Sequence, residues 1–480
     1  MHRNLLIAIA LATACAPRGG PPTAAAPPNP ATLPPGPTSE PPNVDRVLAG
    51  LSLREKAAQL VMPWLAGSYA AYDDWTLAET VRLVDSLHVG GLIVSVGSPL
   101  DVAAKLNSLQ ARSQLPLLVA ADLEGGTAIR LVGGTPFPTN MGVGAGGRDS
   151  DAYAMGRVTA EEGRAVGIHL AFAPVADVNN NPANPIINTR SFGEDPHAVA
   201  RLVAATVRGL EEHGISATVK HFPGHGDTGS DSHLALPVIT ADWRRLDTLE
   251  LIPFRAAIAA GATAVMSAHI AVPALEGGQS RPGTVVPAIL TGLLRDSLHF
   301  QGLVVTDALE MGGLVNAYGG SEAPVLALIA GADLLLQPVD PAATIDAVER
   351  AVRQGRVSEE RLNQSVRRVL ALKQHLGLFE QRMVSLESVP RMVGSAEHLA
   401  TALDVAGRSI VLLADDGTVD RLRARPGRLA LVTYGDEGNP IVGPTLVQEL
   451  RRLGDTVAVF RLWSQSGPAS FDSARAVLRS

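Results

Sequence analysis

Short apolar runs alternate with longer amphipathic stretches along most of the chain. From about residue 44, eight of these runs have strand length and lack polar alternation, which is typical of parallel strands covered on both faces. The predicted strands are Leu60–Trp64, Gly91–Ser95, Leu117–Asp122, Leu170–Asp177, Ala217–His221, Ala264–His269, Leu303–Asp307 and Asp333–Gln337. Helical periodicity predicts helices between them, among them Asp151–Val166, Ala198–His213, Leu251–Ala260 and Glu322–Ala330.

Polar residues stand at the ends of these predicted strands and favour one fold class. Eight strand–helix units over about 300 residues predict a (β/α)8 TIM-like barrel, with an open doubly wound sheet as the alternative. A barrel gathers the carboxyl ends of its strands on one face, where its active site forms, whereas an open sheet spreads them along an edge. The polar residues at these ends are Asp122, Asp177, Lys220, His221, His269, Asp307 and Gln337.

A second, shorter α/β pattern follows the barrel pattern. Residues 44–395 form the predicted catalytic domain, and its last helix stops before Gly377. Residues 396–480 then predict three strands, at Ser409–Leu413, Leu429–Tyr434 and Val457–Leu462, with a helix at Thr445–Leu453. Because so few strands are present, this region is interpreted as a partial α/β sandwich-type C-terminal domain.

The N-terminal pattern is that of an export signal followed by a spacer. His2 and Arg3 precede an apolar run that is too short to span a membrane, and small residues lead to Cys15. Residues 1–15 are therefore a predicted signal peptide, and the segment Ala12–Cys15 resembles a bacterial lipobox, which predicts a lipid anchor on Cys15. An ordinary cleaved signal is the alternative. Residues 16–43 are rich in proline and alanine and predict an extended linker.

Composition narrows the partners of the chain. The net charge is -7 and no long basic run is present, so nucleic acid is not an expected partner. Cys15 is the only cysteine, which excludes disulfides within the chain. Lysine occurs only four times, so Lys220, which lies in a polar loop, is a candidate for a role that needs a compact ammonium group.

The segment from Lys220 to His233 concentrates the titratable residues. It holds three histidines, two aspartates and a lysine beside three glycines and a proline, and it follows a strand-like run. Asp231 and His233 are two residues apart, so the carboxylate is able to fix the histidine tautomer while the second ring nitrogen gives or takes a proton. Such a loop at the end of a rigid strand is a typical place for catalytic groups.

Asp307 is the second candidate for chemistry. An apolar strand carries this carboxylate to the predicted barrel mouth, which suits a nucleophile or a base. The structural alternative is a helix N-cap, in which Glu310, three residues on, closes a capping box. A nucleophile on one strand end and an acid/base on a loop are the two groups that a retaining glycosidase requires.

Two other interpretations of the same loop remain open from the residue types. One is a zinc or two-metal site made by His221, His225, Asp227, Asp231 and His233. The other is a glycine- and histidine-rich loop that packs over the barrel end without chemistry.

Further polar residues are suited to binding a polyhydroxylated ligand. Asp122 and Arg130 flank the turn Glu124–Gly126, and glycines in such a turn let the backbone approach a ligand. Arg190 follows a stretch rich in asparagine and proline.

These segments together resemble glycoside hydrolase family 3, in its bacterial β-N-acetylglucosaminidase branch. The resemblance runs from about Leu51 to Phe379 and rests on Asp122–Gly126 with Arg130, Asn184-Pro185 with Arg190–Gly193, the whole 220–233 loop, Val265–His269 and Thr306–Met311. It implies a retaining mechanism without metal or cofactor. Asp307 then corresponds to the nucleophile, and His233, paired with Asp231, to the acid/base.

The resemblance also implies a sugar-binding set and a substrate. Asp122, Arg130, Arg190, Lys220 and His221 match positions that bind a terminal N-acetylglucosamine. Leu123 and Thr127 depart from the usual residues of the motif around Glu124, so contacts on that side differ. Some relatives with a histidine acid/base use phosphate as the acceptor.

The sequence thus predicts an exported, lipid-anchored exo-β-N-acetylglucosaminidase of the cell envelope. Its expected substrates are cell-wall muropeptides or chitooligosaccharides, and its expected membrane contact is the lipid on Cys15. The alternatives are a β-glucosidase-like or phosphorylase activity in the same family, a metallohydrolase, and a non-catalytic glycan-binding lipoprotein.

Overall fold

The computed structural model describes residues 43–68, 75–424, 427–435 and 443–479. The predicted signal peptide, Cys15 and the linker up to residue 42 lie outside the described residues. Within the described ranges, none of the helices has both the length and the apolar character that a membrane crossing requires.

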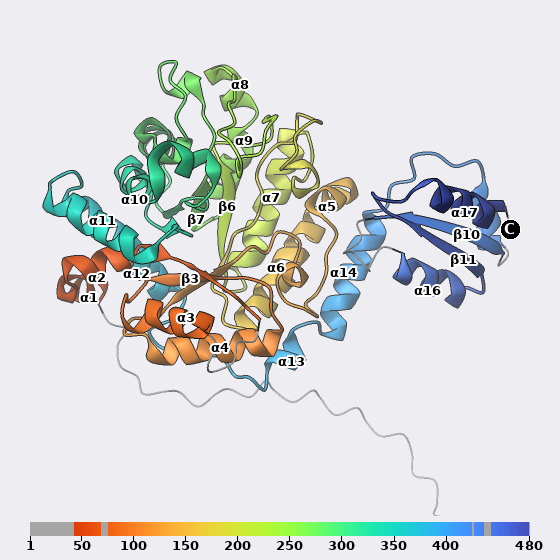
Figure 1. Ribbon diagram of the computed structural model, residues 1–480, viewed down its shortest axis with the longest axis horizontal. Coiled ribbons are helices and arrows are strands. Elements are labelled where there is room, and N and C mark those ends of the chain that lie inside the picture. The colour runs from red at the N-terminus through yellow and green to blue at the C-terminus, as the bar shows by residue number, and fades with distance from the viewer. Residues whose placement is uncertain (1–42, 69–74, 425–426, 436–442, 480) are drawn as a thin grey trace, which may run out of the picture.

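A parallel sheet forms the centre of the main body (Figure 1). Seven strands pair in chain order, which are β2 (Trp64–Leu65), β3 (Gly91–Val94), β4 (Leu118–Ala121), β5 (Leu170–Ala171), β6 (Ser216–Phe222), β7 (Ala264–Ser267) and β8 (Leu303–Val305). A doubly wound sheet reverses its strand order at one point, and this sheet does not, so the open-sheet alternative is wrong for the main body. The prediction of a parallel α/β fold is confirmed.

The two ends of this sheet are connected by a further strand pair. β1 (Val61–Met62) pairs in parallel with β9 (Leu335–Leu336), and the chain leads from β1 into β2 across Pro63. On the other side of β9, Leu334 forms an isolated bridge with Val305 of β8. Hydrogen bonds therefore continue from β8 through β9 to the start of the sheet, which curls back on itself.

Each predicted strand of the main body overlaps an observed one, and most of the observed strands are shorter. The largest difference is at Leu170–Asp177, where only β5 is a regular strand. Pro174 has no N–H to donate, so beyond β5 the chain keeps only isolated contacts with β6, such as the bridge between Val175 and Lys220. In contrast, β6 is longer than the predicted strand Ala217–His221 and runs from Ser216 to Phe222, so Lys220 and His221 lie inside a buried strand.

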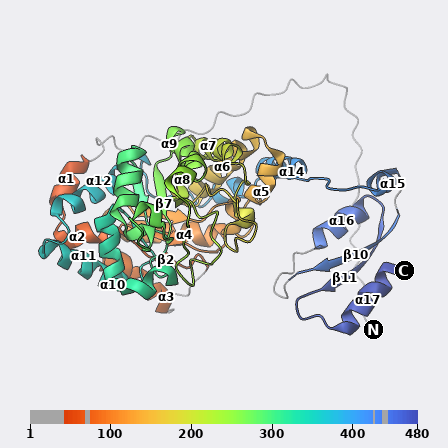
Figure 2. The same cartoon turned by 90° about the horizontal axis from the view of Figure 1, so that it is seen from above.

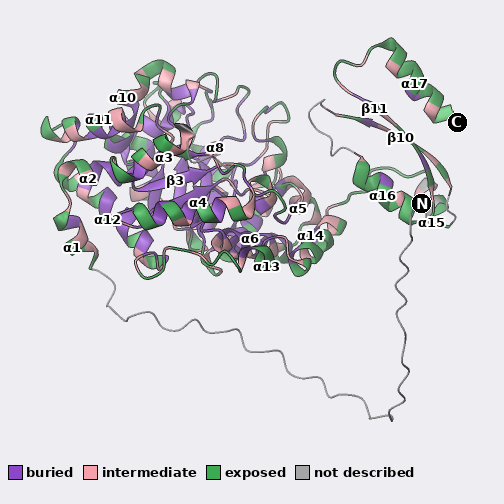
Figure 3. Ribbon diagram, turned by 60° about the horizontal axis from the view of Figure 1, so that its bottom comes forward, coloured by how far each residue is buried: buried purple, intermediate pink, exposed green. Residues whose placement is uncertain are grey.

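Helices cover the outside of the sheet, whose strand residues are buried except for Trp64 of β2 (Figure 3). The long outer helices are α4 (Pro99–Arg112), α6 (Asp149–Ala165), α7 (Pro196–Glu211), α9 (Leu251–Ala259), α10 (Gly312–Ala330), α11 (Pro341–Arg353) and α12 (Glu359–His375). Shorter ones are α1 (Val44–Gly50), α2 (Leu53–Ala58), α3 (Trp75–Asp85), α5 (Asn140–Gly146), α8 (Trp243–Thr248) and α13 (Val389–Met392).

Helices α6 and α7 approach each other closely because glycines face each other at their contact. A Cβ added at Gly156 of α6 would lie 2.5 Å from the carbonyl oxygen of Thr206, and one at Gly209 of α7 would lie 2.3 Å from that of Tyr153. Asp195 caps the start of α7 by accepting from two backbone N–H groups, and Pro196 occupies its first turn.

The C-terminal region forms a small α/β unit beyond helix α14 (Ala396–Arg408), as Figures 1 and 2 show. Its elements are α15 (Thr418–Ala424), β10 (Arg428–Tyr434), α16 (Pro444–Arg452), β11 (Thr456–Leu462) and α17 (Pro468–Arg479), and β10 pairs in parallel with β11. Helix α14 contacts the main body, where His398 Nδ1 lies 2.9 Å from Glu162 Oε1 and Arg408 forms an ion pair with Asp151.

One predicted strand of this region is wrong. Residues Ser409–Leu413 follow α14 without strand structure, and the side chains of Ile410 and Leu413 are 80% and 91% exposed. Its β-branched and apolar residues match strand propensity, but a strand also needs a neighbour to complete its ladder, and this segment pairs with none of the described strands.

Lys373 gives the fold a pH-dependent stability. Its side chain is fully buried in α12, Nζ donates to Gln59 Oε1 at 2.7 Å, and burial lowers the pKa of Lys373 to about 7. The unfolded chain holds its proton up to about pH 10.4, so folding is penalised fully below pH 7, and the penalty disappears as the pH rises towards 10.4. We therefore expect Lys373→Met to raise the melting temperature by about 3 °C or more at pH 6.

This gain should shrink as the pH approaches 10, which thermal unfolding followed by circular dichroism measures across the range. Lys56→Met is the matched control, because Lys56 forms an ion pair with Glu359 and should give no such gain. A gain that grows with pH would contradict the account.

Candidate active site

A cavity of about 440 Å³ opens at the carboxyl ends of the strands. Seven of the eight predicted site residues line it, although they come from five separate segments of the chain. The eighth, Asp231, contacts His233 instead. The seven lining residues are Asp122, Arg130, Arg190, Lys220, His221, His233 and Asp307.

Asp122 follows β4 and pairs with two cations. Its Oδ1 accepts a hydrogen bond from Lys220 Nζ at 2.9 Å, and its Oδ2 accepts one from Arg130 at 3.0 Å. Burial alone would raise the pKa of Asp122, but Lys220 and then Arg130 lower it below its usual value. The carboxylate is therefore ionised and presents fixed acceptor oxygens beside the cavity.

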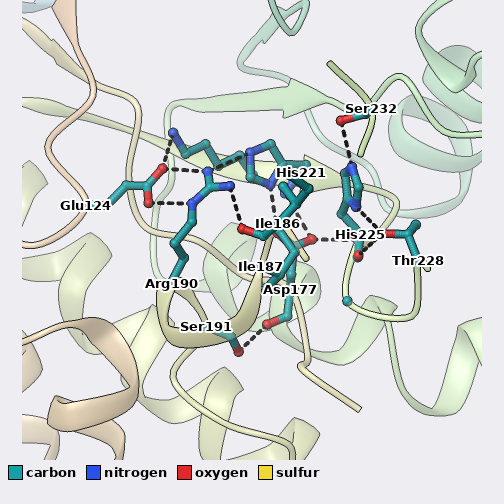
Figure 4. A network of polar contacts seen from close by, with 12 residues as sticks. Glu124, Asp177, Ile186, Ile187, Arg190, Ser191, His221, His225, Thr228 and Ser232 are labelled. Atoms are coloured by element: carbon teal, nitrogen blue, oxygen red, sulfur yellow. Dashed lines mark hydrogen bonds and ion pairs between the residues drawn. The ribbon is translucent and has the colours of Figure 1, made fainter. Parts of the chain in front are cut away.

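Glu124 links Lys220 to Arg190, and Figure 4 shows its carboxylate facing the Arg190 guanidinium. Its Oε1 lies 2.7 Å from Lys220 Nζ, and the two oxygens accept from Arg190 at 2.7 and 2.8 Å in the bidentate arrangement that guanidinium groups favour. Burial would raise the pKa of Glu124, but Lys220 and Arg190 hold it far below its usual range. For Lys220, burial would lower the pKa, but Asp122 and Glu124 raise it.

Asp177 is fully buried and fixes the start of the polar loop (Figure 4). Its Oδ1 accepts backbone N–H groups from His221 at 3.2 Å and His225 at 2.7 Å, and its Oδ2 lies 2.7 Å from His221 Nδ1. Arg190 donates towards His221 Nε2 at 3.3 Å, so Nε2 accepts and Nδ1 carries the proton that Asp177 binds. The His221 ring is therefore held in a single orientation and tautomer.

The structure assigns contacts to Glu124 and Asp177 that the sequence reasoning did not assign. Glu124 lies in the turn Glu124–Gly126 and Asp177 at the end of a predicted strand, but neither was among the predicted site residues. The available signal was their type and position, because each is an acidic residue that follows an apolar strand towards the cavity face.

The turn after β4 depends on a glycine. Gly126 has φ of +90°, and a Cβ added there would lie 2.6 Å from the carbonyl oxygen of Thr135. Only glycine satisfies both the conformation and the close approach, which keeps Glu124 and Arg130 on the same side of the turn.

Asp307 follows β8 and lies in the wall of the cavity. Its Oδ1 accepts the backbone N–H of Ala308 at 2.8 Å. Burial alone would raise the pKa of Asp307, but His221 and His269 lower it below its usual value. The group is therefore a carboxylate at neutral pH, which is the state that a nucleophile or base requires.

The capping-box prediction for Glu310 is wrong. Helix α10 begins at Gly312, and its N-cap is Met311, which makes no side-chain capping bond. Glu310 therefore lies in the turn before the helix instead of at its third position, and Asp307 is too far upstream to cap the helix. The structural alternative for Asp307 as an N-cap fails for the same reason.

Asp231 and His233 form the predicted pair on the loop after β6. His233 Nδ1 lies 2.7 Å from Asp231 Oδ1, which also accepts the backbone N–H of His233 at 2.8 Å. The side chain of His233 is 58% exposed, so its other ring nitrogen is open to a ligand in the cavity. Burial would raise the pKa of Asp231, but the His233 backbone and ring lower it.

The geometry does not support the metal interpretation of this loop. Among the described residues, no group of three or more histidine, cysteine or acidic side chains is arranged to hold a metal ion. His225 uses both ring nitrogens on hydroxyl groups, at 2.7 Å from Thr228 and 3.0 Å from Ser232. Burial also lowers the pKa of His225 to about 4, so its neutral ring serves the internal structure of the loop.

The network predicts different costs for removing the two cations that contact Asp122. Lys220 is 3% exposed in its side chain and pairs with two carboxylates, whereas Arg130 is 28% exposed. Lys220→Met leaves two partly buried carboxylates short of a partner, so we expect it to lower the free energy of unfolding by about 3 kcal/mol.

Arg130→Met is the control, and it should cost about 1 kcal/mol or less because solvent reaches that pair. Urea unfolding of both variants measures the two values. Equal losses would contradict the assignment of Lys220 as the central cation of the network.

This arrangement of cavity, carboxylates and paired histidine corresponds to a known family of glycosidases. The model of the glycosyl hydrolase family 3 N-terminal domain matches residues 52–372. The chain therefore belongs to glycosyl hydrolase family 3, which confirms the resemblance predicted from the motifs.

Individual proteins of the family are similar over much of the chain. Beta-N-acetylglucosaminidase/beta-glucosidase of Cellulomonas fimi is 36% identical over 368 residues, which are 75% of this chain and 65% of that protein. Beta-hexosaminidase LpqI of Mycobacterium tuberculosis is 32% identical over 383 residues, which are 77% of this chain and 96% of that protein. The chain thus spans slightly less than two thirds of the Cellulomonas protein.

A solved structure supports the same relationship. The glycoside hydrolase family 3 beta-N-acetylglucosaminidase from Paenibacillus sp. has a TM-score of 0.79 and 37% sequence identity, over 89% of this chain and 83% of that chain.

Proposed function

We propose that the protein is a retaining exo-β-N-acetylglucosaminidase that removes terminal N-acetylglucosamine from cell-wall muropeptides or chitooligosaccharides. The observation that carries the proposal is the position of an ionised, partly buried carboxylate, Asp307, and of the Asp231–His233 pair beside one cavity. The names of the Cellulomonas and Paenibacillus relatives support the sugar, since both include beta-N-acetylglucosaminidase.

In this proposal Asp307 attacks the anomeric carbon and forms a glycosyl-enzyme. The backbone N–H of Ala308 binds one carboxylate oxygen, which leaves the other oxygen free for the attack. Burial raises the pKa of Asp307, but His221 and His269 lower it by more. The side chain is therefore ionised and can attack without a separate base to remove its proton.

His233 acts as the acid and then as the base. In the first step it gives a proton to the glycosidic oxygen as the bond to the leaving group breaks. In the second step it takes a proton from the water that releases the sugar. Asp231 binds Nδ1, so it fixes the tautomer and stabilises the imidazolium form during this exchange.

The remaining predicted residues bind the terminal sugar. Asp122, Lys220 and Arg190 present a carboxylate, an ammonium and a guanidinium that the network holds in fixed positions, and hydroxyl groups bind well to such charged partners. Arg130 and His221 complete the set from two sides. A cavity of about 440 Å³ lies in the range of small-ligand sites, which favours removal of one terminal residue.

We also propose the finer organisation of the chain on the pattern of its elements. The curled sheet with its outer helices is a (β/α)8 barrel that occupies residues 44–395, and residues 396–480 form part of an α/β sandwich-type domain that α14 ties to the barrel. The N-terminal sequence supports export and a lipid anchor on Cys15, which would hold the enzyme at the cell envelope.

The test is hydrolysis of p-nitrophenyl β-N-acetylglucosaminide with the matching β-glucoside as control. The proposal expects kcat/KM to be at least about 10-fold higher for the N-acetylglucosaminide. Preference for the glucoside would overturn the sugar assignment, and loss of activity on chelation with recovery on adding metal would favour a metallohydrolase. Faster turnover with phosphate and a sugar-1-phosphate product would show the phosphorylase activity instead.

A further inference from the structure

The loop that carries His233 is attached to the helix that follows Asp307. The backbone N–H of Gly312 donates to the carbonyl oxygen of His233 at 3.0 Å, and that of Gly313 donates to Ser232 at 3.1 Å. Both glycines belong to the first turn of α10, which starts five residues after Asp307. The proposed nucleophile and the proposed acid/base are therefore joined by a short path through the backbone.

Glycine at these two positions is required for space. A Cβ added at Gly312 would lie 2.8 Å from the carbonyl oxygen of His233, and one at Gly313 would lie 2.7 Å from that of Ser232. Both distances are shorter than side-chain carbons reach in proteins, and both involve backbone atoms, so a larger residue would displace the loop as a whole. Backbone conformation does not require glycine at either position, because neither residue has a positive φ.

Other attachments of the loop lie away from the His233 backbone. At its start, Asn184 donates to the carbonyl oxygens of His225 and Gly226, both at 2.9 Å. At its exit, the N–H of Ile239 donates to Ala271 at 2.9 Å. Near the tip, His225 contacts the Ser232 side chain at 3.0 Å.

The side chain of His233 is more than half exposed, so packing alone does not position it. The contacts that hold the backbone of His233 to the barrel are those of the two glycines, while Asp231 holds it from within the loop.

We propose that Gly312 and Gly313 are positioning residues for the general acid. They dock the Ser232–His233 backbone onto the start of α10. This docking places the His233 ring beside the glycosidic bond that breaks when Asp307 attacks the anomeric carbon. The inference rests on the proposed function, because it assigns the acid role to His233. It adds that the loop works only in the docked position and that two backbone N–H groups define that position.

The experiment compares two substrates of the same sugar, phenyl β-N-acetylglucosaminide and its 2,4-dinitrophenyl analogue. Phenolate is a poor leaving group and needs the acid, whereas dinitrophenolate leaves without a proton. We expect Gly313→Ala to lower kcat/KM by about 10-fold or more on the phenyl substrate and by less than about 3-fold on the dinitrophenyl substrate. Alanine is the better helix former, which offsets part of the loss of the docking hydrogen bonds, so the melting temperature should fall only slightly.

Gly407→Ala is the matched control, because Gly407 also lies in a helix and a Cβ there meets nothing within 4 Å. It should change neither rate. Gly312→Ala is the second variant and should give the same pattern, which preserves the test if Gly313→Ala does not fold. In a His233→Ala background, Gly313→Ala should add no further loss, because the glycine acts only through His233.

Two results would overturn the proposal. One is an equal loss on both substrates, which would show general damage to the site. The other is a full additional loss in the His233→Ala background. If His233→Ala itself shows no dependence on the leaving group, the acid role fails and the docking role fails with it. In that case the p-nitrophenyl assay still decides the sugar specificity separately.

Discussion

Replacing Asp307 by asparagine is expected to lower kcat/KM for N-acetylglucosaminides by about 10⁴-fold or more. The amide has no nucleophilic oxygen, so the glycosyl-enzyme does not form. The variant keeps an oxygen that accepts the N–H of Ala308, and Asp307 forms no ion pair within 4 Å among the described residues. The melting temperature should therefore change little, and steady-state kinetics with thermal unfolding measure both effects.

Asp296→Asn is the control for this substitution. Asp296 is exposed on the π-helical segment Ala288–Ser297, away from the cavity, and its variant should keep wild-type activity. Activity of Asp307→Asn within about 10-fold of wild type would be incompatible with covalent catalysis at this residue.

Replacing His233 by alanine has the second largest expected effect, and the loss depends on the leaving group. For chitobiose or the phenyl substrate we expect kcat/KM to fall by about 10² to 10⁴-fold, which is the usual contribution of a general acid. For the 2,4-dinitrophenyl substrate the loss of kcat/KM should be small, because bond cleavage no longer needs a proton. The side chain is exposed, so stability should not change.

Asp231→Asn separates the proton donor from the residue that orients it. The amide keeps the size of the side chain but no longer stabilises the imidazolium, so we expect a loss of about 10-fold to 10²-fold on the phenyl substrate. If kcat/KM on the phenyl substrate fell further in Asp231→Asn than in His233→Ala, Asp231 and not His233 would be the proton donor. An equal fall in kcat/KM of His233→Ala on the phenyl and 2,4-dinitrophenyl substrates would show that His233 is not the general acid.

The Asp231–His233 pair and Asp307 could be predicted from the residues themselves because their chemistry is local, whereas Asp122, Arg130, Arg190, Lys220 and His221 were assigned through the family resemblance. Asp231 and His233 are two residues apart and bond to each other, and Asp307 directly follows an apolar strand, so residue type and spacing carried the information. The alternation of apolar runs and helices was likewise sufficient for the order of the parallel sheet, because consecutive strands pair in sequence.

The parts that the sequence did not predict depend on distant partners. Glu124 contacts Arg190 across 66 residues, and Asp177 contacts His221 across 44. Nothing in the neighbourhood of either acid shows these contacts, which form only when the strands curl and bring their ends together. The start of α10 at Gly312, which leaves Glu310 without a capping role, coincides with backbone hydrogen bonds from Gly312 and Gly313 to the distant 220–233 loop.

The wrong strand at Ser409–Leu413 has the same cause. Its residues favour an extended strand, but strand formation needs a partner strand, and this segment pairs with none of the described strands. The residue types therefore indicate strand propensity correctly but do not show whether a partner strand is present.

The most direct test of the central claim is to trap the glycosyl-enzyme and locate it. The enzyme is incubated with a slowly turned-over fluorinated N-acetylglucosaminyl donor, digested, and analysed by mass spectrometry, while the anomeric configuration of the product is followed by NMR. Covalent catalysis by Asp307 predicts one sugar on the peptide that contains this residue, with retention of the β configuration. A sugar on another residue, or a product of inverted configuration, would contradict it.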